Sequence, residues 1–288
     1  MKKVIVIGSG FAGLSSAAYL SKEGFDVTVV EKNKQIGGRA RNFKAEGYTF
    51  DMGPSWYWMP EIFDNFFHSF NHTTNDFYEL KKLDPGFKIV FDNAEMILPA
   101  NWNEICDLFD SYEDNGAKKL NKFMEDAEKK YSIGLRFLYN SPGLSVTELL
   151  KRDVLFNANK LQLLTSYRKH IKRHFTDPRL ISLLEFPVLF LGTSAESAPA
   201  LYSLMAYSGI KQGTFYPMGG FAKVIDSMAE ICKNNGVKFL LEEQVTKINI
   251  FNKTVKSVTT KTQELPANFV VGAADYVHIE SKLSLIHI

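Results

Sequence analysis

The chain has 288 residues, of which 45% are apolar and 23% charged, and its formal net charge is +2. This length allows one or two domains with a large core, and the near-neutral charge gives no general attraction to nucleic acid. Cys106 and Cys232 form no redox or metal motif and suit a reducing cytosol, and the histidines lack metal-ligand spacing, so we expect no metal. No apolar run approaches the length of about 18 residues that a membrane span needs.

A short apolar strand and a glycine-rich turn open the chain. Residues 4–7 form a β-branched run that is typical of a buried parallel strand. Gly8 permits a tight turn, Gly10 lets the backbone approach a pyrophosphate, and Gly13 lets the next helix pack closely. We predict that helix over residues 11–22, with free N–H groups at its start for phosphates.

The second predicted strand, residues 27–30, ends at an acidic residue. Glu31 can accept hydrogen bonds from the hydroxyls of an adenosine ribose, and its charge would repel a 2′-phosphate. Strand, turn, helix, strand and acid therefore follow in the order of a dinucleotide-binding unit. A glycine-rich turn without any ligand is the alternative.

Two further glycine-containing segments follow. Gly37-Gly38 precedes Arg39, and residues 47–55 form a loop rich in Gly and Pro. A domain for nicotinamide alone has no need of them, whereas in many flavoproteins such a pair extends the turn and the arginine contacts the cofactor. The loop allows backbone to approach a flat ring, although an ordinary turn would look the same. Together the motifs favour FAD.

The rest of the chain alternates between helical and strand patterns. A predicted helix over residues 61–70 has one aromatic face, which is either core or the lining of an apolar channel: Phe63, Phe66, Phe67 and Phe70. Residues 77–99 predict a hairpin or meander, and residues 101–191 are mainly helical. The helical region includes an apolar stripe of Leu120, Phe123, Met124, Ala127 and Tyr131. The predicted elements beyond it are a helix at 221–234, a strand at 237–241, a hairpin within 247–260 and a strand from 269.

Residues 154–176 are basic and contain no acidic residue. Their cations are Lys160, Arg168, Lys169, Lys172 and Arg173, and the apolar residues at helical spacing are Leu161, Leu164, Tyr167, Ile171 and Phe175. Such a helix can lie on an anionic bilayer, where each cation contributes about 1 kcal/mol. The other interpretation is a solvated face above a buried stripe.

The motifs at 8–13, 31, 37–39 and 50–55 resemble those of the bacterial phytoene desaturases, a carotenoid desaturase family within the flavin amine oxidase superfamily. The first motifs specify only the superfamily. Segments further along are similar to family segments that point to the carotenoid branch, and they lie at 185–192, 198–205 and 213–220. The resemblance covers essentially residues 1–282.

This resemblance implies an α/β fold, in which an α+β substrate or lid domain is inserted into a Rossmann-like FAD-binding domain of the GR2 type. The FAD domain would comprise residues 1–75 and 213–282, and the inserted domain, which can face a membrane, residues 76–212. The implied FAD contacts are Gly8, Gly10, Phe11, Ala12, Gly13, Glu31, Lys32, Gly38, Arg39, Gly53, Pro54, Ser55 and the backbone of Val245.

The implied activity is FAD-dependent desaturation of a carotenoid precursor, from phytoene to a lycopene-type product. The enzyme would be cytoplasmic and peripheral on the inner face of the cell membrane. Hydride transfer to flavin N5 followed by proton loss would form the double bond. Trp56, Tyr57 and Trp58 either line an apolar tunnel or pack in the core. The acid/base pair of some relatives is matched only in part, by Glu148 and Arg152, which are otherwise structural surface residues.

Three other functions stay open. The first is a related isoprenoid oxidoreductase, such as a C30 or hydroxylated carotene desaturase or a retinol saturase-like enzyme. The second is a non-catalytic isoprenoid binder like the GDP dissociation inhibitors, and the third is an amine oxidase. Because relatives continue well beyond this chain, we expect an N-terminal fragment that lacks the C-terminal part, is inactive alone and ends in a sequencing artefact at residues 283–288. The oligomeric state and the electron acceptor are not specified by these residues.

Overall fold

The structure, a computed structural model, describes residues 1–140 and 161–283. The chain forms two compact units: unit 1 comprises residues 1–81 and the chain from residue 216 onward, and unit 2 lies within residues 82–215. The observed division thus falls a few residues after each of the domain limits expected from the sequence.

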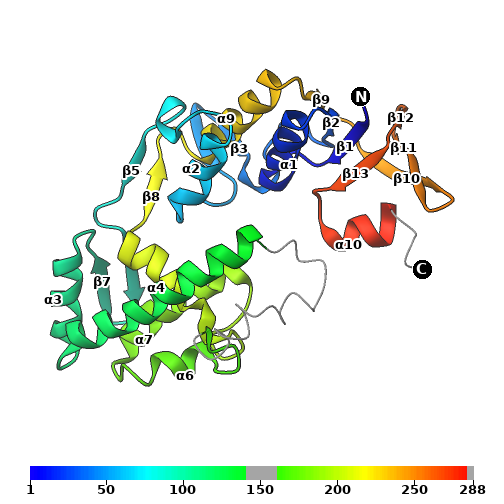
Figure 1. Cartoon of the computed structure of the whole chain (residues 1–288). Helices are drawn as coiled ribbons and strands as arrows, with labels where there is room; N and C mark the ends of the chain where they lie inside the picture. Colours follow the sequence, from blue (N-terminus) through cyan, green and yellow to red (C-terminus); the bar gives the residue numbers. More distant parts are fainter. Residues whose placement is uncertain (141–160, 284–288) are drawn as a thin grey trace. The chain divides into compact units, whose positions relative to one another are not determined.

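Unit 1 combines parallel strands, helices and a small antiparallel sheet (Figure 1). Its first strands and helices are β1 (Lys3–Ile7), α1 (Phe11–Lys22), β2 (Asp26–Val30), β3 (Asn42–Ala45), β4 (Tyr48–Asp51), α2 (Pro60–His68) and β5 (Leu80–Lys82). The later ones are β8 (Phe215–Pro217), α9 (Phe221–Asn234), β9 (Lys238–Leu240), β10 (Val245–Phe251), β11 (Thr254–Thr260), β12 (Glu264–Pro266), β13 (Phe269–Gly272) and α10 (Tyr276–His278).

The central sheet of unit 1 has the strand order β13-β1-β2-β9, and all three pairings are parallel. Because side chains alternate along a strand, β1 presents Ile5 and Ile7 to one face and Val4 and Val6 to the other, and all four are buried. The parallel strand that the β-branched run predicts is therefore confirmed. Burial on both faces explains why this run contains no polar residue.

Each face of this sheet has its own cover. Ile5 and Ile7 share a core with residues of the antiparallel sheet β10-β11-β12, among them Val245 and Val258. Helix α1 contacts β1, β2 and β13 and also packs against α9, where the Cys232 thiol donates a hydrogen bond to the Leu14 carbonyl at 3.2 Å. The predicted helices at 11–22 and 221–234 are thus confirmed as α1 and α9.

In its described part, unit 2 is mainly helical and contains a β-hairpin. Its elements are β6 (Phe87–Phe91), β7 (Ala94–Leu98), α3 (Trp102–Tyr112), α4 (Gly116–Asn140), α6 (Tyr167–Ile171), α7 (Pro178–Glu185), the 3-10 helices Phe186–Leu191 and Ala200–Tyr202, α8 (Ser203–Ala206) and the π-helix Tyr207–Gln212. The predicted apolar stripe of α4 is buried along its whole length, from Leu120 to Tyr131. The predicted hairpin is β6-β7, whereas β5 pairs with the distant β8.

The basic segment that could have formed a membrane-lying helix folds differently in its described part. Tyr167, Ile171 and Phe175 are fully buried, so they belong to the core of unit 2 and cannot enter a bilayer. Leu164, by contrast, is fully exposed. The sequence pattern detects the apolar face correctly, but the rest of unit 2 covers most of it. Lys160 lies outside the described residues.

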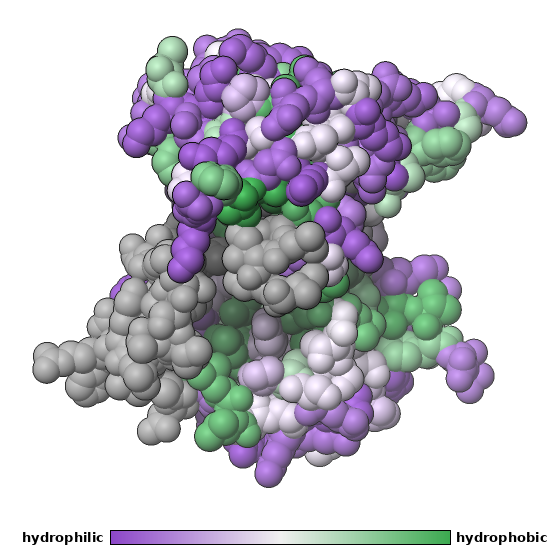
Figure 2. Space-filling view, turned by 90° about the vertical axis from the view of Figure 1, so that its right-hand side faces the viewer, coloured by the Kyte–Doolittle hydropathy of each residue, from purple (hydrophilic) through white to green (hydrophobic). Residues whose placement is uncertain are grey.

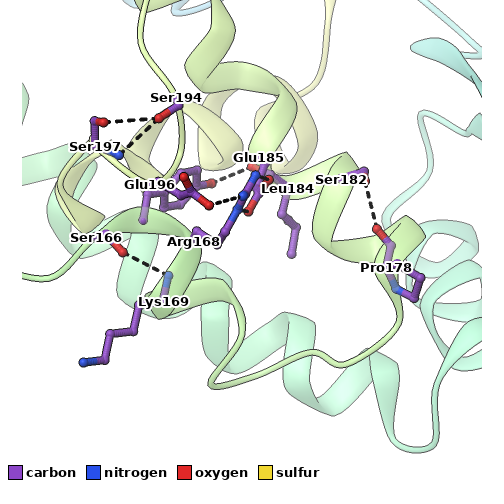
Figure 3. Close-up of polar contacts among 11 residues, drawn as sticks. Ser166, Arg168, Lys169, Pro178, Ser182, Leu184, Glu185, Ser194, Glu196 and Ser197 are labelled. Carbon is purple, nitrogen blue, oxygen red and sulfur yellow. Dashed lines mark hydrogen bonds and ion pairs between the residues drawn. The ribbon is translucent and has the colours of Figure 1, made fainter.

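Arg168 of α6 is paired with two carboxylates of unit 2 (Figure 3). Its Nε and Nη2 atoms donate to Glu185 Oε1 and Oε2, both at 2.6 Å, and Nη1 donates to Glu196 at 2.6 Å. The backbone next to it is tied to the same region, because the Arg168 N–H donates to the Ala195 carbonyl at 2.8 Å. The Lys169 side chain points away from this ion-pair cluster in Figure 3.

On the face of the molecule drawn in Figure 2, hydrophobic areas lie among hydrophilic ones. In unit 2 the exposed apolar side chains include Leu163, Leu164, Leu189, Phe190 and Leu191. Within the described residues, no helix combines the length and the apolar character needed to cross a membrane.

Candidate functional site

The site begins at the N-terminus of α1, where two glycines allow a very tight approach. Gly8 has φ +101°, a conformation that favours glycine, and a Cβ atom on Gly13 would lie only 2.0 Å from the Gly8 carbonyl oxygen. The first backbone bond of the helix runs from the Leu14 N–H to the Gly10 carbonyl at 2.9 Å. Gly10 is the N-cap residue of α1 and has no side chain that could bond the first N–H groups, and the first turn has no acidic residue. The N–H groups of Phe11, Ala12 and Gly13 are therefore available to an anion.

The second glycine motif is bonded directly to this turn. The Gly37 N–H donates to the Ser9 carbonyl at 2.9 Å, and Gly38, with φ +57°, would place a Cβ atom 3.4 Å from Gly10 Cα. Arg39 lies in the same short 3-10 turn and is exposed. Two backbone segments that are almost thirty residues apart in the sequence therefore pack directly against each other.

The third motif packs against the second. A Cβ atom on Gly53 would lie 2.1 Å from the Arg39 carbonyl oxygen, and the Met52 N–H donates to the Arg41 carbonyl at 3.1 Å. Pro54 and Ser55 follow and are exposed. The three glycine-containing segments that the sequence singles out thus lie together, and their close approaches leave no room for side chains.

Glu31 lies at the end of β2 and is buried, with 4% of its surface exposed. Its Oε2 atom accepts from the Ser9 N–H at 3.0 Å and from the Ser9 hydroxyl at 2.7 Å. Its Oε1 atom accepts from the Asn33 N–H at 3.0 Å and from the Asn33 side-chain amide at 2.6 Å. The carboxylate therefore faces the glycine-rich turn, while the adjacent Lys32 is exposed.

Val245 is brought to the same end of the sheet by the backbone. The Glu243 N–H donates to the Glu31 carbonyl at 2.9 Å, and Val245 begins β10 two residues later. Its side chain is buried in the core that contains Ile7 and Val30. This leaves the backbone of Val245 as the part that can contact a ligand.

Asp51 is a structural residue of the site to which the sequence analysis assigned no role. Its Oδ1 atom accepts from the Phe221 N–H at 3.1 Å, and it therefore caps the N-terminus of α9. Gly220 has φ +80°, and a Cβ atom there would lie 2.7 Å from the same oxygen. Asp51 stands two residues before Gly53, within a motif already noted, but no local sequence signal indicates that its partner is the start of α9.

Aromatic rings support the N-terminus of α1. The Phe11 ring lies 5.7 Å from Phe63 and 6.1 Å from Phe221, and Tyr57 lies 4.5 Å from Phe63, measured between ring centroids. Tyr57 is fully buried and belongs to the core. Phe66 and Phe67 on α2 and Phe70, two residues after the helix ends, are also buried, which supports core packing over a channel lining.

A second polar cluster lies in unit 2. Lys130 is completely buried, and its ammonium donates to Asp126 Oδ2 at 2.6 Å and to Gln162 Oε1 at 3.3 Å. The buried His170 Nε2 lies 3.3 Å from the same Asp126 oxygen. Burial raises the pKa of Asp126, but the contacts with His170 and Lys130 outweigh it and lower the pKa to about 2.

The two acid/base candidates, Glu148 and Arg152, lie outside the described residues. Within the described part of the chain, no three His, Cys, Asp or Glu side chains are grouped so that they could hold a metal ion.

The donor set fits a nucleotide that carries a diphosphate. The free N–H groups of α1 suit the anionic oxygens, and the glycines beside Gly10 leave the backbone uncovered. The Glu31 carboxylate stands at the neighbouring strand end, where a ribose would lie in such units.

Comparisons with known proteins agree with this arrangement. A family model described as flavin containing amine oxidoreductase matches residues 11–285. The carotenoid 3,4-desaturase of Haloarcula japonica is 33% identical over 288 residues, which covers 97% of this chain and 57% of that protein. The phytoene desaturase of Fusarium fujikuroi is 31% identical over 288 residues, covering 98% of this chain and 50% of that protein. The chain thus spans about half the length of the curated relatives it matches.

Among solved structures, an oxidoreductase from Methanosarcina mazei is similar with a TM-score of 0.63 at 20% identity, covering 99% of this chain and 62% of that chain. This likeness confirms the predicted α/β fold. The family model matches nearly the whole sequence, and the chain belongs to the flavin containing amine oxidoreductase family.

Proposed function

We propose that unit 1 binds FAD and that the complete protein uses it to desaturate a carotenoid precursor, such as phytoene. The observation that carries the proposal is the convergence of Gly10, Gly38 and Gly53 beside the uncapped start of α1, with Glu31 at the next strand end. The names of the two desaturase relatives support the carotenoid class of substrate.

Different residues of this chain would contact different parts of the cofactor. The N–H groups of α1 would bind the diphosphate, and Glu31 would bind the adenosine ribose. Arg39, Gly53, Pro54 and Ser55 would hold the part of the cofactor that lies beyond the diphosphate. When bound, FAD supplies a two-electron oxidant that accepts a hydride from a substrate C–H bond, and loss of a proton from the adjacent carbon completes the double bond.

Unit 2 would bind the hydrocarbon substrate. It lies between two chain segments of unit 1 in the sequence, and it exposes several large apolar side chains, including Leu189, Phe190 and Leu191. A hydrocarbon has no polar group for recognition, so an apolar surface is what such a substrate requires.

The test is to express the complete gene, and its Gly10→Ala variant as a control, in cells that make phytoene. We expect a coloured polyene and a yellow, flavin-containing protein from the unchanged gene and neither from the variant. Unchanged phytoene with bound flavin would indicate another isoprenoid as the substrate. A colourless protein after saturation with FAD would contradict the proposal.

We also propose that unit 2 contacts the anionic inner face of the cell membrane. Leu163 and Leu164 are exposed, and the nearby Lys169, Lys172 and Arg173 are exposed cations. Arg168 does not contribute, because its guanidinium is engaged by Glu185 and Glu196. Each free cation near the surface would contribute about 1 kcal/mol of binding.

Co-sedimentation with vesicles that contain an anionic lipid would test this contact. Changing Lys169, Lys172 and Arg173 to Glu should abolish most of the binding. The matched control makes the same charge change at Lys247, Lys253 and Lys256, which are exposed in unit 1, and should leave binding nearly intact. Equal binding of both triple variants and the unchanged chain would rule the contact out.

A further inference from the structure

The Glu31 carboxylate is fully occupied by donors of its own chain. Two of its four hydrogen bonds come from Ser9, one from the N–H and one from the hydroxyl, and the other two come from the N–H and the side-chain amide of Asn33. An ionised carboxylate has about four lone-pair positions. A ribose that donates its hydroxyls to Glu31 must therefore replace donors that are already present.

The four donors are not equally replaceable. The two backbone N–H groups are fixed by their strands and turns, and the Asn33 carbonyl accepts a further bond from the Glu242 N–H at 3.1 Å. The Ser9 hydroxyl belongs to a residue with 0% exposure. The Asn33 side chain is the exception, because its residue is half-buried and stands after the strand has ended.

We propose that the Asn33 side-chain amide stands in for a ribose hydroxyl and is displaced when a nucleotide binds. The inference rests on the proposed function, since it concerns the same site and names the residue that sets its nucleotide affinity. In the free chain the amide supplies the fourth donor to a buried carboxylate, which without it would have three. On binding, one donor is exchanged for another, so the diol adds little net affinity.

The exchange makes an unusual prediction for the loss of this side chain. Asn33→Ala leaves both backbone N–H groups and the Ser9 hydroxyl in place, but it leaves Oε1 short of one donor in the free chain. The ribose then meets no competitor, and the affinity for ADP should rise about tenfold, the value of one hydrogen bond to a charged group. A residue that merely positions Glu31 would have the opposite effect.

The experiment measures binding of ADP and of 2′,3′-dideoxy-ADP to the full chain by calorimetry. In the unchanged chain the two ligands should bind within about threefold of each other, because the diol gains only what Asn33 loses. In Asn33→Ala, ADP should bind about tenfold more tightly and the dideoxy ligand with unchanged affinity. The thermal midpoint of the variant should be lower without ligand and should approach that of the unchanged chain at saturating ADP.

Asn121→Ala, in unit 2, is the matched control and should alter neither affinity. If ADP binds the unchanged chain much more tightly than the dideoxy ligand, or if Asn33→Ala weakens or does not change ADP binding, the displacement is refuted while the nucleotide site stands. If neither ligand binds the unchanged chain, the proposed function fails together with the inference. The comparison of ADP with the dideoxy ligand on the unchanged chain needs no variant, so it tests the displacement even where Asn33→Ala folds poorly.

Discussion

Gly13 faces Gly8 across a gap that no side chain can enter, since a Cβ atom on Gly13 would lie 2.0 Å from the Gly8 carbonyl oxygen. Gly13→Ala should therefore force α1 away from the turn that follows β1. We expect the free energy of unfolding to fall by about 3 kcal/mol, the upper part of the range for overpacking. Urea denaturation followed by circular dichroism measures this, and an unchanged midpoint would show that the helix can shift without loss.

Gly10 provides the contrasting case. A Cβ atom there would meet only the Gly37 carbonyl oxygen, at 3.9 Å, and the φ of −76° suits any residue. Gly10→Ala should therefore leave the urea midpoint close to that of the unchanged chain. Its methyl group would stand where a diphosphate approaches the backbone, so the affinity for FAD should fall at least tenfold. Flavin fluorescence titration measures this affinity. An unchanged affinity for FAD would mean that the diphosphate does not bind at this turn.

Among the described residues, the buried Lys130 is paired with a single carboxylate, that of Asp126. Asp126→Asn would leave its ammonium in the core without a counter-charge, and removing one partner of such a pair costs about 3 kcal/mol or more. We expect a matching loss of unfolding free energy at neutral pH. The control is Asp107→Asn on α3, since Asp107 is exposed. Similar small losses in both variants would mean that Lys130 finds another partner.

The lowered pKa of Asp126 predicts how the stability of the chain depends on pH. Its pKa is lowered from 3.8 to about 2, so the ionised form is favoured by folding. The contribution of the Asp126 carboxylate to the free energy of unfolding is complete above about pH 4 and is lost as the pH falls from 3.8 towards 2. The difference in unfolding free energy between the unchanged chain and Asp126→Asn should therefore shrink across this interval. Denaturation curves at several acidic pH values measure it, and a constant difference would exclude this linkage.

Phe67 tests whether the aromatic face of α2 is core. It has 0% exposure, and truncating such a residue costs about 3–5 kcal/mol. Phe67→Ala should lose that much stability, whereas Phe251→Ala, at a site with 65% exposure, should lose little. A small effect at Phe67 would indicate that the aromatic face of α2 is not core and would favour the channel lining instead.

Local patterns in the sequence predicted the elements that are specified locally. The β-branched run at 4–7 and the glycine spacing at 8–13 predicted β1, the turn and α1, because a buried parallel strand and a tight turn each restrict the residue types that fit. Likewise, the apolar period of α4 identified the residues that are now seen to be buried.

Contacts between distant segments could not be predicted in this way. Nothing in the local sequence says that Asp51 caps α9, which begins 170 residues later, or that Gly53 packs on the Arg39 carbonyl. The pattern at Tyr167, Ile171 and Phe175 shows an apolar face without showing what covers it. The donors of Glu31 were missed for a similar reason, since Ser9 and Asn33 are common turn residues and only the fold brings them to one carboxylate.

The strand order β13-β1-β2-β9 has a consequence for synthesis on the ribosome. β1 and β2 are translated first, but the two strands that flank them emerge only after the whole of unit 2. Throughout that interval the nascent chain exposes both edges of a β-branched pair, and open edges of this kind recruit other chains. Translation pauses and chaperone binding before residue 238 should therefore affect the yield of soluble protein.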